Sequence, residues 1–206
     1  MGYFNEEHSL FRESLREFLE REVRPNIEEW EKAGKIPKSI WQKMGKMGFL
    51  GLTFPQKYGG GDLDFFFEVI FNEELGRLNS GGFVITQQVV QYMSAPYIYK
   101  YGSDKLKEKY LPGTISGDLI GCIGITEPDA GSDTKNIQTK AELIDGHYLI
   151  NGSKTFITNG LYGDYIILVV KTDTSAGSKG VSLICVDLSL KGITKNKINK
   201  KTSSNS

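Results

Sequence analysis

The run TEPDAGSD at residues 126–133 lies just after the point where the spacing of apolar residues along the chain changes. Up to about residue 117, apolar residues recur every three or four positions, which is typical of helices that bury one face. From Leu119 onward they alternate with polar residues between turn signals, which is typical of strands. A second run, GSKTFITNG at residues 152–160, falls in this later part. The sequence therefore predicts an α+β chain in which an all-helical domain precedes an antiparallel β-domain.

The helical part carries recognisable start and stop signals. Asn5 is a good N-cap, and the two acidic residues that follow it suit the first turn of a helix. Pro25 should interrupt or kink the helix that begins there. Further helices are expected over residues 40–47, 63–75, 83–101 and 103–111. Pro96 should kink the third of these helices or mark a boundary within it, and the fourth should end before Pro112. The helix with three consecutive phenylalanines, over 63–75, is apolar around most of its circumference, which predicts burial on more than one side.

The β part is punctuated by turns. Asp145-Gly146 is a strong hairpin signal between two short alternating segments. The apolar runs at 165–170 and 181–186 are typical of strands. We expect a helical domain over residues 1–117, an incomplete middle β-domain over 118–190, and a polar basic tail over 191–206.

Composition excludes several classes of function. The chain has 25 basic and 25 acidic residues, so nothing in its charge favours a nucleic acid or an anionic membrane as partner. No apolar run is long enough for a membrane span. Cys122 and Cys185 lie in apolar runs, which favours reduced core thiols and a cytoplasmic location. The N-terminus has no signal peptide pattern. His8 and His147 fit no metal-ligand spacing, so we expect no metal site.

The loop at 126–133 could hold a phosphate. Gly131 would let a ligand approach the backbone, and Ser132 offers a hydroxyl and a backbone N–H to a pyrophosphate oxygen. Taken alone, such a turn after a strand can equally be a simple loop, and Phe156 can equally be a core aromatic. Three polar residues are expected to order loops rather than react: Asp133, Lys154 and Asn159.

The two runs, together with the helical domain before them, resemble the acyl-CoA dehydrogenases over residues 5 to about 200, most closely the long-chain type and related bacterial members. The resemblance implies a flavoprotein oxidoreductase of fatty acid β-oxidation and lipid metabolism, with FAD as cofactor and acyl-CoA as substrate. It implies an electron-transfer flavoprotein as partner and a homo-oligomer when complete. The expected fold is the helical domain followed by a β-barrel-like domain, truncated before a C-terminal four-helix bundle.

The resemblance also assigns residues. Residues matching the flavin-edge segment of the family are Ile123, Gly124, Ile125 and Thr126, and those matching the pyrophosphate loop are Gly131 and Ser132, the latter also near the acyl-CoA. Phe156 matches an aromatic, commonly Trp, that packs on the isoalloxazine, and Ile157 and Thr158 follow it, with the Thr158 hydroxyl matching a group near flavin N5. Phe in place of Trp keeps a stacking face but lacks the indole donor.

The family's reaction removes an α-proton with a carboxylate and transfers hydride to flavin N5, giving a trans-2-enoyl-CoA. Glu127 is a tempting local base, but the matching family residue belongs to the loop framework, and the base is expected beyond Ser206. We therefore expect no catalytic residue in this chain, and an inactive polypeptide. Glu73 and Glu74 are expected on the helix surface or between domains. Two alternatives stay open: a non-catalytic remnant or interaction module, and an acyl-CoA oxidase or nitroalkane-oxidising relative.

Overall fold

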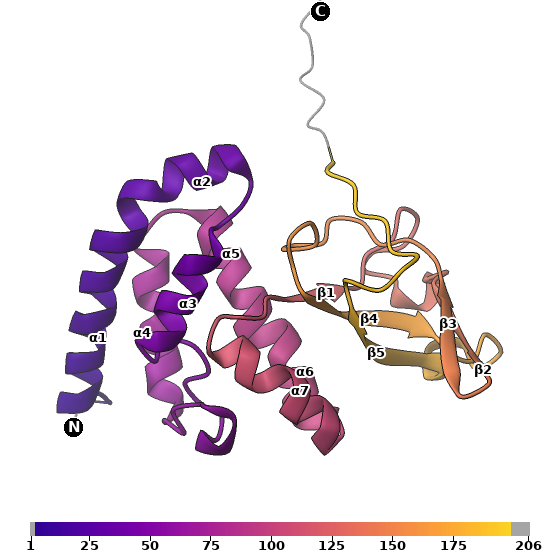
Figure 1. The fold of residues 1–206 in the computed structure, drawn as a ribbon, viewed down its shortest axis with the longest axis horizontal. Helices are drawn as coiled ribbons and strands as arrows, with labels where there is room; N and C mark the ends of the chain where they lie inside the picture. Colours follow the sequence, from indigo (N-terminus) through magenta and orange to yellow (C-terminus); the bar gives the residue numbers. More distant parts are fainter. Residues whose placement is uncertain (1–2, 199–206) are drawn as a thin grey trace, which may run out of the picture. The chain divides into compact units, whose positions relative to one another are not determined.

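The computed structural model describes residues 3–198 and divides into two compact units, Met1–Gly121 and Cys122–Ser206 (Figure 1). Helices make up the first unit and a sheet makes up the second, so the predicted α+β class is confirmed. The domain limits expected at residues 117 and 190 stay predictions.

The first unit contains seven α-helices and four short helical segments of other types among the described residues. The α-helices are α1 (Glu6–Phe18), α2 (Ile27–Ala33), α3 (Lys38–Lys46), α4 (Phe65–Gly76), α5 (Gly81–Gln88), α6 (Ala95–Tyr101) and α7 (Asp104–Ile115). The short segments are the π-helical η1 (Leu19–Val23) and η4 (Val89–Ser94), and the 3-10 turns η2 (Arg24–Asn26) and η3 (Gln56–Tyr58).

The start of α1 confirms the predicted N-cap and adds a partner that the sequence did not reveal. The Asn5 side chain accepts a hydrogen bond from the His8 backbone N–H at 2.9 Å, and His8 Nδ1 accepts one from the Asn5 N–H at 3.1 Å. With Nδ1 as acceptor, the ring proton lies on Nε2, which donates to Asp64 at 3.1 Å. Asp64 is itself the N-cap of α4, since it accepts from the Phe66 N–H. One buried imidazole thus joins the caps of two helices.

Replacing His8 by alanine is expected to lower the free energy of unfolding by about 2 kcal/mol. It removes one cap contact at each helix and the packing of the ring on Phe67, 4.4 Å away. Urea denaturation followed by circular dichroism measures this. The other histidine provides the matched control, since His147 is exposed and its alanine variant should change stability by under about 0.5 kcal/mol. Equal effects for the two variants would contradict the assignment.

The prolines act as predicted in two of three places. Pro25 lies in η2, directly after the π-helical η1, where the first helix changes direction and becomes α2. Pro96 lies at the start of α6, directly after the π-helical η4. The change to π-helical hydrogen bonding before the proline accommodates its lack of a backbone N–H. The expectation that the last helix ends before Pro112 is wrong, because α7 continues to Ile115. Burial of Leu111 and Ile115, 0% and 5% exposed, favours continuing the helix despite the lost hydrogen bond.

Two expectations for α4 need correction. Burial is one-sided at its start, because Phe65 is 67% exposed whereas Phe67, Ile70 and Phe71 are buried. Glu74 lies inside the first unit rather than on its surface or between domains, and only 2% of it is exposed. The following paired contacts from α1 explain this: Arg16 donates to both Glu74 oxygens at 2.8 and 2.7 Å, and Arg12 donates at 3.0 Å. Hydrogen bonds from Arg16 lower the pKa of Glu74, so the buried carboxylate stays charged and paired.

The second unit is a five-stranded sheet: β1 (Gly121–Gly124), β2 (Lys140–Ile144), β3 (His147–Asn151), β4 (Tyr165–Lys171) and β5 (Val181–Asp187). The order is β1-β4-β2-β3, with β5 paired to β4. The hairpin between β2 and β3 forms at Asp145 and Gly146, whose φ values of 49° and 79° suit the predicted tight turn.

The prediction of a wholly antiparallel, barrel-like sheet is wrong at one pairing. β2–β3 and β4–β5 are antiparallel, but β2 and β4 are parallel where Lys140 meets Lys171. The reason is the connection over residues 152–164, which lets the chain return beside β2 in the same direction after the β3 reversal. Within residues 3–198 no pairing joins β3 to β1 or β5, so the sheet is open.

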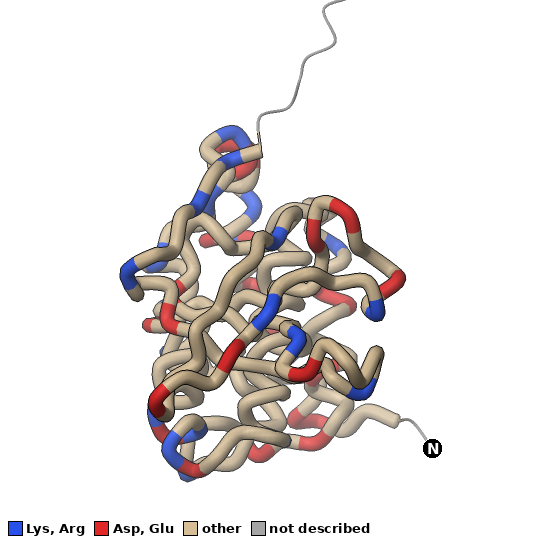
Figure 2. The backbone as a smooth tube through the Cα atoms, turned by 90° about the vertical axis from the view of Figure 1, so that its right-hand side faces the viewer, with Lys and Arg blue, Asp and Glu red and all other residues tan. Residues whose placement is uncertain are grey.

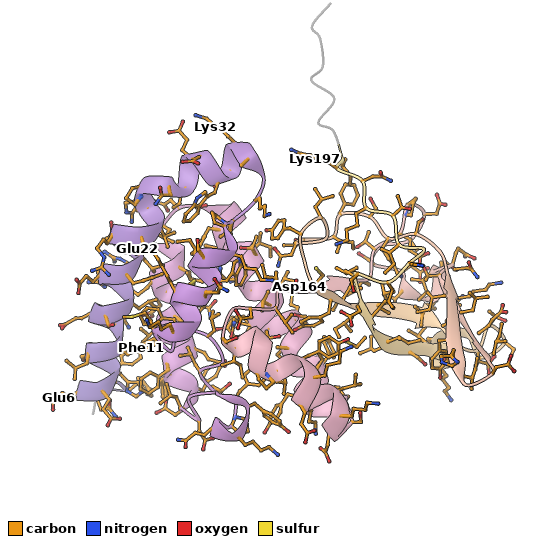
Figure 3. All side chains as sticks on the ribbon, in the orientation of Figure 1. Glu6, Phe11, Glu22, Lys32, Asp164 and Lys197 are labelled. Atoms are coloured by element: carbon orange, nitrogen blue, oxygen red, sulfur yellow. The ribbon has the colours of Figure 1, made fainter. Side chains whose placement is uncertain are left out.

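Basic and acidic residues are interspersed along the described backbone in Figure 2, in keeping with 25 basic and 25 acidic residues. Side chains such as Glu6 and Lys32 project from α1 and α2 in Figure 3, while Lys197 lies on the irregular segment after β5. Part of the expected basic tail, residues 199–206, lies outside the described residues. Within the described part, no helix combines the length and apolar character that crossing a membrane requires.

Candidate functional site

The two sequence runs are joined side by side in the second unit. The Thr155 N–H donates to the Thr126 carbonyl at 2.8 Å. Lys154 Nζ donates to the Ile125 carbonyl at 3.1 Å and to Glu127 Oε1 at 2.8 Å. The segment that follows β1 and the segment that follows β3 are therefore held together by backbone and side-chain bonds. Residues far apart in sequence become one loop cluster at the ends of these strands.

Glu127 is the centre of this junction. Its side chain is 4% exposed, and it accepts hydrogen bonds from the Gln138 and Thr139 backbone N–H groups and from the Thr139 hydroxyl, in addition to Lys154. Burial alone raises the pKa of this carboxyl, but the hydrogen bonds outweigh burial and lower the pKa to about 2. A carboxylate with this pKa and both oxygens engaged is a poor proton acceptor. Glu127 is thus a structural residue.

This low pKa predicts loss of stability in acid. Because the folded-state pKa of Glu127, about 2, lies below its ordinary value of 4.5, its contribution is complete above pH 4.5 and disappears as the pH falls towards 2. The contribution should be about 3 kcal/mol. An NMR titration of the Glu127 side-chain carbonyl carbon measures the pKa directly. A midpoint near 4.5 would refute the prediction.

Phe156 has an unusual backbone and an unusual exposure. Its φ is +57°, in the left-handed region that a bulky side chain rarely adopts, and its side chain leaves the residue 75% exposed. Asn159 has a φ of +64°, but it is buried and accepts a hydrogen bond from the Tyr162 hydroxyl at 2.9 Å. Packing within the described chain accounts for Asn159 but not for Phe156. Strain combined with an exposed aromatic ring is typical of a ligand contact.

Three hydroxyl groups of the cluster have no hydrogen-bond partner among the described residues: Thr126, Ser132 and Thr158. Ser132 is exposed and the two threonines are half-buried. Beside Ser132, a Cβ added to Gly131 would meet nothing within 4 Å. Protein packing therefore does not require glycine there, and the space is open to a ligand. Together these groups offer donors near a bare stretch of backbone, as phosphate recognition requires.

The remaining predicted residues lie in β1 and in the adjoining loops. Gly124 is buried, and a Cβ there would come within 2.8 Å of Leu168. Ile123 and Ile157 are half-buried, and Ile125 packs against the small core formed by Ala130, Ile137 and Val169. Gly124 and Ile125 thus have a packing role whatever they bind.

Three other polar residues order loops as expected. Asp133 accepts from the Lys135 N–H and the Asn136 amide, while Lys154 and Asn159 make the bonds given above. Sequence reasoning missed Thr139, which supplies two of the donors to Glu127 and which no pattern singles out. Within the described residues no cluster of His, Cys, Asp or Glu could hold a metal ion.

Comparison with known proteins matches both units. The family model for the acyl-CoA dehydrogenase N-terminal domain matches residues 5–118, and the model for the middle domain of the same family matches residues 122–206. Among curated proteins, the chain is 40% identical to the mitochondrial long-chain specific acyl-CoA dehydrogenase of Rattus norvegicus over 198 residues, covering 94% of this chain and 45% of the relative.

Solved structures are similar as well. An acyl-CoA dehydrogenase from Geobacillus kaustophilus matches with a TM-score of 0.91 and 42% identity, over 96% of this chain and 52% of that chain. A glutaryl-CoA dehydrogenase from Mycobacterium smegmatis, solved in complex with FADH2, matches with a TM-score of 0.87 and 30% identity, over 97% of this chain and 50% of that chain. The chain thus spans about half the length of the relatives that it matches.

Proposed function

This chain belongs to the acyl-CoA dehydrogenase family, and from that premise we propose that its second unit contributes part of an FAD site in an enzyme that oxidises acyl-CoA. The observation that carries the proposal is Phe156, an exposed aromatic held at a φ of +57° in the loop cluster that also carries three hydroxyls without a hydrogen-bond partner among the described residues. The FADH2 complex of the Mycobacterium smegmatis relative supports the choice of flavin.

The residues present fit such a cofactor. Phe156 would offer its face to the isoalloxazine, and the Thr126 and Thr158 hydroxyls would donate to polar atoms of the ring. Ser132, next to the open backbone at Gly131, would hold pyrophosphate oxygens and lie near the acyl-CoA. Ile123, Gly124, Ile125 and Ile157 complete the proposed set, chiefly as backbone that lines the ring edge.

When bound, FAD would accept a hydride from the substrate, so the proposed overall reaction converts an acyl-CoA to a trans-2-enoyl-CoA. This chain's own residues bind and orient. The proposal assigns no proton abstraction to Glu127, because its pKa is about 2 and its oxygens are already engaged. An electron-transfer flavoprotein is the proposed electron acceptor, and a homo-oligomer is the proposed assembly. A cytoplasmic location is proposed on the strength of two free cysteines.

Titration of the purified chain with FAD tests the proposal. Because the site is open, with Phe156 and Ser132 both exposed, we expect weak binding, with a Kd of micromolar or higher, or about 8 kcal/mol at most. Flavin fluorescence and absorbance measure it. Thr158→Val should perturb the bound flavin spectrum more than Ser182→Ala, because the Ser182 hydroxyl lies 2.7 Å from that of Thr172, the residue just after β4.

The outcomes separate the alternatives. No flavin binding at millimolar concentration would favour a non-catalytic interaction module. Nanomolar binding would refute the open half-site. Productive reoxidation of bound reduced flavin by O₂, in the complete enzyme, would favour an oxidase over a dehydrogenase.

A further inference from the structure

We propose that the first unit carries a separate binding site for a small phosphate ester, in a hollow between α3, the η3 loop and the end of α7. The hollow has a volume of about 440 Å³, and all of its lining residues belong to the first unit. It therefore does not depend on the flavin site proposed above. Its volume is within the usual range for small-molecule sites.

The hollow is apolar at its base and basic at its edge. Tyr58, Pro112 and Ile115 supply apolar surface, and Lys46 and Lys57 supply two ammonium groups. No carboxylate is among the lining residues. Within residues 3–198, Lys46 has no ion-pair partner, and the Lys57 ammonium lies over the Tyr58 ring, 4.8 Å from its centre. The Lys46 ammonium is therefore available to an anion, whereas the Lys57 ammonium is already attracted to Tyr58 and to the Asp104 carboxylate and would be shared between them and a ligand.

The walls of the hollow are closely packed, which favours a preformed site. α3 packs so closely on the end of α7 that a Cβ at Gly45 would lie 2.3 Å from the Ser116 carbonyl oxygen. The glycine-rich loop that carries Lys57 is also tight, because a Cβ at Gly60 would lie 2.1 Å from the Phe54 carbonyl oxygen. The turn is closed by a hydrogen bond from the Gly59 N–H to Gln56 at 2.8 Å. Preorganised walls reduce the entropy lost on binding.

One nearby acid sets a limit on affinity. Asp118 does not line the hollow, but its two oxygens accept hydrogen bonds from lining residues, at 2.8 Å from Gln42 and 2.7 Å from Ser116. Its negative charge opposes an anion, and it also occupies donors that could otherwise bind one. A phosphate dianion is favoured over a monocarboxylate, because it gains more from two ammonium groups. A compact apolar body on the phosphate suits the base formed by Tyr58 and Ile115.

Titration of the full chain with phenyl phosphate, followed by two-dimensional NMR, tests this site. We expect saturable shifts of the Gly45, Gly59 and Ser116 amides. Lys46→Gln and Lys57→Gln should each weaken binding at least threefold, and the double variant should abolish saturation. Asp118→Asn should strengthen binding. Lys35→Gln removes one exposed charge outside the hollow and is the matched control, with no change expected.

Phenol tests the apolar contact alone, and inorganic phosphate tests the contact with the ammonium groups alone. Each should bind more weakly than phenyl phosphate. If phenol bound equally well, or if Lys35→Gln weakened binding as much as the lysine variants of the hollow, the proposal would be overturned. If a variant loses its folded spectrum, the unaltered chain can be titrated with phenyl phosphate at NaCl concentrations from 0.05 to 0.3 M instead. Binding that depends on the two ammonium groups should weaken severalfold over this range. Binding that is indifferent to salt would also overturn it. Loss of flavin binding leaves all of these results unaffected.

Discussion

Replacing Lys154 by methionine is expected to lower the free energy of unfolding by about 3 to 5 kcal/mol. The substitution keeps most of the apolar stem of the side chain but leaves Glu127, 4% exposed, without its cation. It also removes the donor to the Ile125 carbonyl. Both losses fall on the junction that joins the two loop segments. Urea denaturation gives the size of the effect, and hydrogen exchange of the β2 and β4 amides locates it.

Lys140→Met is the matched control, because Lys140 lies on β2 and is exposed. It should change stability by under about 0.5 kcal/mol. The double variant Glu127→Leu/Lys154→Met should be less destabilised than the sum of the two single variants, since no charge is then left unpaired. Additive single and double effects would show that the pair does not interact as the geometry indicates.

Gly152→Ala is expected to be nearly as damaging, at about 4 kcal/mol. A Cβ on Gly152 would lie 2.4 Å from the Thr139 hydroxyl oxygen and 2.6 Å from the Thr139 Cα, and the φ of +155° is unfavourable for alanine. Since Thr139 also holds Glu127, the displacement would propagate to the Glu127–Lys154 pair. Thermal unfolding and the Glu127 pKa should both change.

Gly146→Ala is the control for backbone strain, so the difference between the two variants gives the steric part of the effect. Gly146 also has a positive φ, +79°, but a Cβ there would meet nothing within 4 Å. Its alanine variant should cost about 1 to 2 kcal/mol, for backbone strain alone. If both variants cost the same, crowding against Thr139 is not what requires glycine at 152.

The features that sequence predicted well are those determined by neighbouring residues. The Asn5 cap, the Asp145-Gly146 hairpin and the interruption at Pro25 depend on backbone preferences within a few positions. The candidate site was located because its two runs match a known family. Its internal order was not predicted, because the partners of Glu127 lie 11 to 27 positions away.

The errors have the same physical origin. Pro112 signals a helix end locally, but burial of Leu111 and Ile115 overrides it. Glu74 carries a surface-like side chain, yet two arginines on another helix make its burial favourable. The parallel contact of β2 with β4 depends on how a long connection returns, which strand periodicity does not encode. Tertiary partners decide each of these cases.

The left-handed backbone at Phe156 places two engineering goals in opposition. Glycine or asparagine would relieve strain of about 1 to 3 kcal/mol at this φ, so a screen for thermostability alone should enrich them. A screen for retained flavin should instead enrich aromatic residues, which supply a stacking surface. Variants selected for heat resistance would then lose the aromatic ring while their melting temperature rises. Position 156 is therefore the first position to check in a stabilised version of this chain.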